Sequence, residues 1–189
     1  MQEIVLANGV VFGIDDVIFQ STIIGGERMP ILINREENVV LELNLIKNQR
    51  FDVKKERPYF ENWIPFEFIL RIEDSEEYSY SKQSGATFSV EDINLLIKRI
   101  ESAISLKSNK KEIVRLSWGP IENYFSLHFY ETYEDNQINI ELWVMMAELT
   151  EGESHGYNRG FDFVVTLDSL EKFLIGFKEQ LTMLLNSVE

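Results

Sequence analysis

The sequence contains no cysteine and only two histidines among its 189 residues. Without cysteine, the chain has no disulfide framework, no thiolate nucleophile and no thiolate metal ligand. No stretch approaches the roughly 18 consecutive apolar residues of a transmembrane helix. The N-terminus also lacks the basic and long apolar regions of a signal peptide. These absences predict a protein of a reducing compartment, and we expect it in the cytoplasm.

Positive charge is scarce as well, with 18 Lys and Arg against 32 Asp and Glu and a net charge of −14. Such an excess of carboxylates repels phosphate backbones and anionic lipid headgroups, so we expect neither nucleic acid nor a membrane as partner. A basic protein partner remains compatible with this charge. The content of 44% hydrophobic and 12% aromatic residues is typical of a folded globular protein.

What the sequence does contain is an internal repetition. Residues 38–106 and 123–187 each predict two strands with alternating apolar residues, a polar loop and an amphipathic helix. Residues 1–37 predict further strands, and no linker is visible, so we expect residues 1–189 to form a single domain. Strands joined by hairpins and followed by a helix predict an α+β fold. We expect a mostly antiparallel sheet, shared by both repeats, with the two helices on one face.

Neither histidine has the neighbours of a catalytic or metal site. His128 lies on the predicted strand 123–131, where it shares a face with Tyr124 and Ser126; acid–base chemistry there is an alternative to a partly exposed sheet histidine. His155 lies in the glycine-rich segment 152–160, which lacks the Gly-Lys-Ser/Thr ending of a phosphate-binding loop. No ligand spacing for zinc is present. We predict no catalytic residue, no cofactor and no metal.

Aromatic and methionine side chains gather on one face of the second repeat. On the predicted strand 138–149, Trp143 and Met145 alternate with aliphatic residues and share a face with Glu141. Across the strand pair they would join Tyr130 and His128. Exposed aromatic patches are typical of protein-binding surfaces. The alternative is that the N-terminal strands cover this face and make it part of the core.

Charge is also separated along the strands of the first repeat. Antiparallel pairing places a basic connector, residues 47–57, at one end of the predicted strands 38–46 and 66–73. We call the carboxylates at the other end the acidic pole: Glu36, Glu37, Glu73, Asp74, Glu76 and Glu77. The last four are the predicted electrostatic contacts with a basic partner. The simpler interpretation is a set of solvated hairpin ends.

The order of elements resembles the immunity proteins that are paired with bacterial wall-associated polymorphic toxins, the tRNA-nuclease type in particular. The resemblance covers residues 38–187. It is carried by residues 42–45 (Glu-Leu-Asn-Leu), Trp63, residues 88–92 (Phe-Ser-Val-Glu-Asp), residues 124–129 (Tyr-Phe-Ser-Leu-His-Phe) and residues 161–167. It implies a small acidic cytoplasmic protein that neutralises a toxin by binding.

Three hypotheses therefore stand. The first is a non-enzymatic binding protein that docks through the acidic pole and the face of Trp143. The second is a small-molecule-binding or enzymatic domain that uses the face around His128, Tyr130 and Trp143. The third is a self-associating structural module, in which the uncovered sheet face forms a homodimer.

Overall fold

The computed structural model describes residues 23–24, 27–73, 75–80, 85–150, 152–153 and 155–188. One antiparallel sheet contains β3 (Ile31–Ile33), β4 (Val39–Leu45), β5 (Trp63–Ile72) and β6 (Glu76–Tyr80), with β7 (Thr87–Ser89) paired to β5. The second contains β8 (Leu116–Trp118), β9 (Phe125–Tyr130), β10 (Gln137–Met145) and β11 (Asn158–Thr166). The main helices are α1 (Val90–Ser108) and α3 (Leu167–Asn186). Shorter elements are β1 (Ile23–Ile24), β2 (Glu27–Arg28), η2 (Tyr59–Glu61) and α2 (Met146–Leu149).

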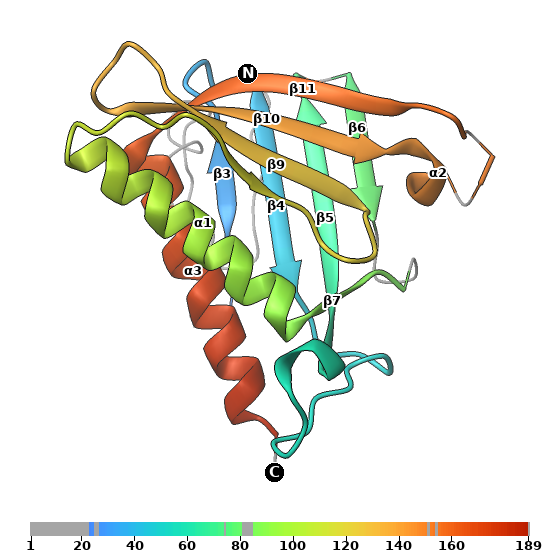
Figure 1. Cartoon of the computed structure of the whole chain (residues 1–189). Coiled ribbons are helices and arrows are strands. Elements are labelled where there is room, and N and C mark those ends of the chain that lie inside the picture. Colours follow the sequence, from blue (N-terminus) through green and yellow to red (C-terminus); the bar gives the residue numbers. More distant parts are fainter. Residues whose placement is uncertain are drawn as a thin grey trace, which may run out of the picture.

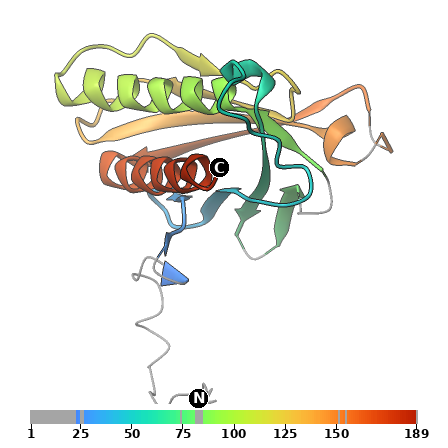
Figure 2. The same ribbon diagram turned by 90° about the horizontal axis from the view of Figure 1, so that it is seen from below.

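The α+β class is confirmed, whereas the two repeats form separate sheets and not the single shared sheet expected from the sequence; β1 and β2 pair with each other as a third, two-stranded sheet. The sheets pack with their apolar faces together, so that Phe68 of β5 lies 4.6 Å from Phe125 of β9 between ring centroids. Strand alternation predicts that each strand has a buried face, but it does not say which faces meet. The strands of the two sheets cross, and α1 and α3 lie side by side next to them (Figures 1 and 2).

Each of the two long helices begins after a residue whose side chain caps its N-terminus. The Ser89 hydroxyl accepts a hydrogen bond from the backbone N–H of Asp92 at 3.0 Å, and the Asp92 carboxylate accepts one from Ser89 N–H at 3.2 Å. This capping box follows from a serine with an acidic residue three positions later. The Thr166 hydroxyl caps α3 in the same way through the backbone N–H of Ser169, at 3.1 Å.

Helix α3 closes one edge of the first sheet with side-chain hydrogen bonds. The Ser169 hydroxyl accepts from the backbone N–H of Ile33 at 3.2 Å and donates to its carbonyl at 2.9 Å. Beyond the start of β3, the buried amide of Gln180 accepts from Leu45 N–H at 3.0 Å and donates to the Asn44 side chain at 3.3 Å. These two side chains replace the strand that is missing at the β3–β4 edge.

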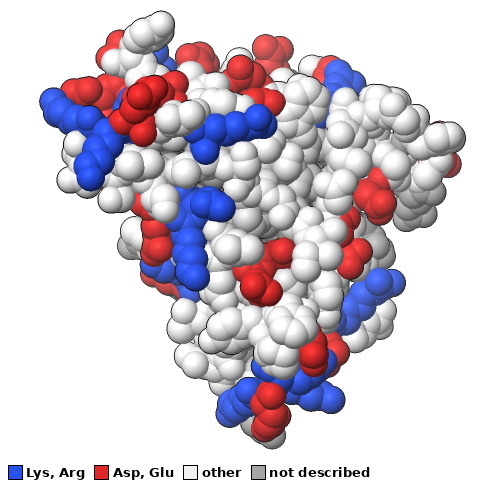
Figure 3. Space-filling model, in the orientation of Figure 1, with Lys and Arg blue, Asp and Glu red and all other residues white. Residues whose placement is uncertain are grey.

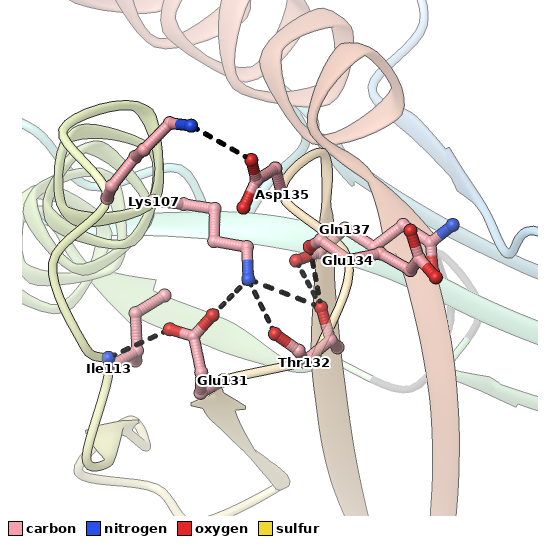
Figure 4. A network of polar contacts seen from close by, with 8 residues as sticks. Lys107, Ile113, Glu131, Thr132, Glu134, Asp135 and Gln137 are labelled. Carbon is pink, nitrogen blue, oxygen red and sulfur yellow. Dashed lines mark hydrogen bonds and ion pairs between the residues drawn. The ribbon is translucent and has the colours of Figure 1, made fainter.

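Helix α1 lies against β8, at one edge of the second sheet, and a buried lysine fastens its end. The Lys107 ammonium forms an ion pair with Glu131 and donates to the Thr132 carbonyl at 2.8 Å (Figure 4). The other Glu131 oxygen accepts from the backbone N–H of Ile113 at 3.0 Å. The network ties α1 to the turn between β9 and β10.

The elements follow the same order in both halves: β3–β4–β5–β6 leads through β7 to α1, and β8–β9–β10–β11 leads to α3. Whether the two repeats superpose, and whether residues 1–189 are one domain, stay predictions. Of the predicted N-terminal strands, β1 pairs with β2 and β3 with β4, while residues 1–22 lie outside the described part. No helix among the described residues is long and apolar enough to cross a bilayer.

Two strand boundaries of the second repeat differ from the prediction. Strand β10 ends at Met145 and the chain turns into α2, because the apolar run continues and alternation alone does not mark the end. Strand β11 begins at Asn158 and includes Gly160, which the sequence placed in the glycine-rich segment. Because β11 begins earlier than predicted, its first residues pair with the last residues of β10 and lengthen the second sheet.

Candidate functional site

The structure brings the predicted aromatic face together on the outer side of β9 and β10. The register pairs His128 with Glu141, and Trp143 with Ser126, so these side chains share one face of the sheet. Tyr130 and His128 are half-buried, and Trp143 is 38% exposed. Met145 follows on the same side and is half-buried. Their role in partner binding stays a prediction.

The sequence predicted Tyr124 on the same face as His128, but the structure does not place it there. Its ring packs in the interior, 5.5 Å from the ring of Phe66 and 5.3 Å from that of Tyr80. Strand β9 begins only at Phe125, and Asn123 has a positive φ of 53°. The backbone therefore turns before the regular alternation starts, and Tyr124 leaves the outer face.

Glu141 lies at the centre of the face and holds two of its aromatic side chains. The Tyr130 hydroxyl donates to one carboxylate oxygen at 2.7 Å, and the Trp143 indole N–H donates to the other. These two donors lower the pKa of Glu141, with the Tyr130 bond the larger cause. The same bond to Glu141 raises the pKa of the Tyr130 hydroxyl. The sequence placed Glu141 on this face without giving it a role.

Two further residues, which sequence reasoning missed, fix the position of the aromatic rings. The guanidinium of Arg115 lies over the Tyr130 ring, 5.5 Å from its centroid. The Trp143 indole lies over Gly160 of β11 so closely that a Cβ there would come within 2.8 Å of the ring. A glycine inside a strand signals such a close approach, but only after β11 is known to include it. Trp143 is thus a pre-positioned, partly exposed aromatic side chain.

His128 lacks the arrangement of a catalytic base. The Ser126 hydroxyl lies 3.4 Å from its Nε2, but its buried Nδ1 has no hydrogen-bond partner within the described chain. A nucleophile–histidine pair needs an acceptor at the second nitrogen to orient the ring, and Glu141 is engaged with Tyr130 and Trp143. Burial, and then the charge of Arg115, lower the pKa of His128. This geometry gives no support to the enzymatic hypothesis.

The described residues of the acidic pole lie in two turns and at the start of β6, and part of their charge is neutralised by arginines. Glu73 has a positive φ of 51° and its N–H donates to the Asn38 carbonyl at 2.7 Å, which joins the two turns. Glu76 pairs with Arg159 and Glu77 with Arg71, each at 3.2 Å. Asp74 lies outside the described residues.

Arg159 connects the acidic pole to β11. It lies on β11 directly before Gly160, and its guanidinium also lies over the ring of Tyr78, at 5.3 Å from the centroid. The carboxylate of Glu76 therefore reaches the strand over which the Trp143 indole lies. Arg159 is on the same side of β11 as Phe161, whose ring lies 5.1 Å from that of Tyr78, whereas Trp143 lies on the other side of the strand. The acidic pole and the aromatic face thus meet β11 from opposite sides.

The opposite end of the first sheet carries both signs of charge. Figure 3 shows Lys and Arg side chains mixed with Asp and Glu at the lower end of the molecule, where the connector between β4 and β5 lies. There Arg57 forms an ion pair with Asp52 and donates to the Glu61 carbonyl at 3.0 Å. Tyr59 and Phe60 are exposed beside it, at 63% and 52%. Across the described ranges, no group of three or more His, Asp or Glu could hold a metal ion.

Comparisons with known proteins give one family. A solved structure titled as that of the plant transcriptional regulator PBF-2 matches with a TM-score of 0.40 and 13% identity, over 79% of this chain and 78% of that one. At that level it carries no argument about this chain. No curated protein matches the sequence. The family described as immunity protein WapI-like matches residues 31–184. This match covers the sheets of both repeats, all of α1 and most of α3, so the chain belongs to the immunity protein WapI-like family.

Proposed function

We propose that this chain protects the cell that makes it by binding a cognate toxin directly, without catalysis. The observation that carries the proposal is membership of the immunity protein family over residues 31–184. The binding surface in this proposal combines the outer face of β9 and β10 with the acidic pole. Its central contacts are Trp143, Met145, Tyr130 and His128.

The geometry of Trp143 supports its role as the anchor. The indole is held by Glu141 and lies on Gly160 while 38% of the residue stays exposed. A rigid aromatic side chain loses little conformational entropy on binding, so more of its contact energy appears as affinity. Half-buried Tyr130 and Met145 border it and would exclude water from the contact.

The acidic pole supports a basic partner. The whole chain has a net charge of −14, and carboxylates at the rim of an interface accelerate association with a cationic surface. Glu36 and Glu37 lie in the turn that precedes Asn38, and Glu73 is hydrogen-bonded to the Asn38 carbonyl, so these carboxylates lie close together. The absence of cysteine fits a reducing compartment, and the proposal places the protein in the cytoplasm.

The test of this function begins with a search for a toxin gene next to the gene of this chain, and the toxin domain found there is then co-expressed with the chain. The proposal expects the chain to restore growth and to form a stoichiometric complex that is stable in size-exclusion chromatography with light scattering. The control is Phe60→Ala, which removes an exposed aromatic ring far from the proposed surface. If substoichiometric amounts of the chain inactivated the toxin without forming a complex, the enzymatic hypothesis would replace direct binding.

A further inference from the structure

The edge strands of the two sheets differ in what covers them. Helix α3 covers the β3–β4 edge through Ser169 and Gln180, and α1 lies against β8. Strand β11 forms the remaining edge of the second sheet and runs along the upper margin of the molecule in Figure 1. Its first three residues, Asn158 to Gly160, and Asp162 are exposed. Helices α2 and α3 both contact β11, but within the described chain neither helix forms a hydrogen bond with residues 158–162.

Two backbone hydrogen bonds show which groups of β11 point outward. The Val164 carbonyl accepts from Arg35 N–H at 2.8 Å and therefore points away from β10. In β10, the N–H of Met145 donates to the Tyr124 carbonyl at 3.0 Å and therefore points away from β11. Met145 is paired with Asn158, so the backbone groups of Asn158 also point away from β10. Every second residue of a strand points to the same side. The backbone groups of Gly160 and Asp162 thus point out of the sheet, and no strand among the described residues pairs with them.

The charge around this edge selects a cationic partner. Asp162 lies on the edge itself, directly opposite Glu141 of β10. Pairs of like charge opposite each other are unfavourable. Arg115 already lies near Glu141, so Asp162 is the carboxylate of this pair that a cation from a partner would meet. Of the two arginines at the edge, Arg159 is paired with Glu76, and Arg35 is followed by Glu36 and Glu37. The acidic pole therefore borders both ends of the exposed edge.

Trp143 adds an apolar contact at the same place. Its ring lies over Gly160, the residue at the middle of the open segment. A strand added beside β11 would lie next to this ring, so that alternate side chains of the added strand could contact it. Backbone pairing at a sheet edge supplies affinity, and such neighbouring contacts supply specificity.

We infer that residues 158–162 of β11 bind an extended, Lys- or Arg-containing segment of the toxin by strand addition. This inference rests on the proposed function and names the part of the partner that the surface takes. A second copy of the chain fits less well, because it would bring another −14 of charge to the same edge.

Two substitutions at one position separate backbone pairing from charge. Asp162→Asn removes the carboxylate but keeps the N–H, whereas Asp162→Pro removes both at a position where the N–H points away from β10. With the neighbouring toxin domain as probe, we expect Asp162→Pro to bind at least about tenfold more weakly than Asp162→Asn. Equal affinity of two folded variants would overturn strand addition.

A second measurement covers the case in which the proline variant does not fold. Because the chain has no cysteine, Asn158→Cys accepts a single environment-sensitive fluorophore at the open edge, and Glu179→Cys on the exposed side of α3 is the control. We expect the toxin domain to change the emission at position 158 and not at 179. A complex that leaves the label at 158 unchanged overturns the inference while the proposed function stands.

Two other outcomes also decide. If no complex forms at all, the proposed function fails and the inference with it. If the chain without toxin self-associates and changes the emission of the label at 158, the edge binds a second copy, and the toxin assignment is wrong.

Discussion

The β3–β4 edge and the β11 edge show two ways in which one small protein ends a sheet. At the first, Ser169 and Gln180 of α3 hydrogen-bond to the backbone of Ile33 and Leu45 as a strand would. At the second, Gly160 and Asp162 are exposed and point outward, and no strand among the described residues pairs with them. Uncovered edges favour unwanted pairing, and proteins usually block them.

The difference separates what the fold requires from what binding requires. Gln180 is buried, and its loss affects the folding equilibrium. The open half of β11 contributes little buried surface, so a residue there can be selected for contact with a partner. The following predictions test this division, from the largest expected effect to the smallest.

Gln180→Ala should destabilise the fold by about 1–3 kcal/mol, because the buried Leu45 N–H loses its acceptor and cannot reach water. The measurement is the free energy of unfolding from urea denaturation. Glu179→Ala, an exposed neighbour on the same helix, should change it by less than about 0.5 kcal/mol. Equal stability of Gln180→Ala and wild type would show that the β3–β4 edge is not closed by this side chain.

Trp143→Ala should affect toxin binding more than folding stability. The complex with the toxin domain should weaken by about 2 kcal/mol, mainly through faster dissociation. The free energy of unfolding should fall by a smaller amount, about 1 kcal/mol, because the indole also packs on Gly160 and donates to Glu141 in the free protein. Surface plasmon resonance gives the association and dissociation rates. Phe60→Ala is the matched control, and a similar loss for both variants would remove Trp143 from the binding surface.

Neutralising Glu73, Asp74, Glu76 and Glu77 together should slow association severalfold at low salt, and the deficit should shrink as ionic strength rises. Because Glu76 and Glu77 are already paired with Arg159 and Arg71, we expect most of the effect from the other two acids. Stopped-flow association rates at several salt concentrations measure it. An unchanged rate in low salt would reduce the acidic pole to a contribution to solubility.

The smallest effect concerns pH. The pKa of Glu141 is lowered in the folded protein, first by the Tyr130 hydroxyl and then by the Trp143 indole. The ionised Glu141 therefore stabilises the fold fully above the pKa that Glu141 has in the unfolded chain. This stabilisation is lost as pH falls through the lower pKa of Glu141 in the folded protein. The indole N–H resonance of Trp143 should shift in that range, and Glu141→Gln should abolish the shift. A shift that persists in the variant would assign the titration to another group.

Sequence patterns predicted individual elements better than their arrangement. The face shared by His128, Tyr130 and Trp143 follows from local spacing, because successive side chains of a strand alternate between its two faces. The division into two sheets does not follow, because alternation identifies a buried face without its partner.

The closing roles of Ser169 and Gln180 depend on an edge about 136 positions away in the chain. The place of Gly160 beneath Trp143 likewise requires the register of β11. Long-range register is the information that a single sequence lacks.

Amide hydrogen exchange in the free protein and in its toxin complex tests the difference between the edges most directly. In the free protein, the N–H groups of Ile33 and Leu45 should exchange slowly and those of Gly160 and Asp162 rapidly. In the complex, exchange at Gly160 and Asp162 should slow by at least about tenfold, with no change at Ile33 and Leu45. Slow exchange at Gly160 and Asp162 already in the free protein, or no change there in a complex that forms, would contradict an open edge that binds the toxin.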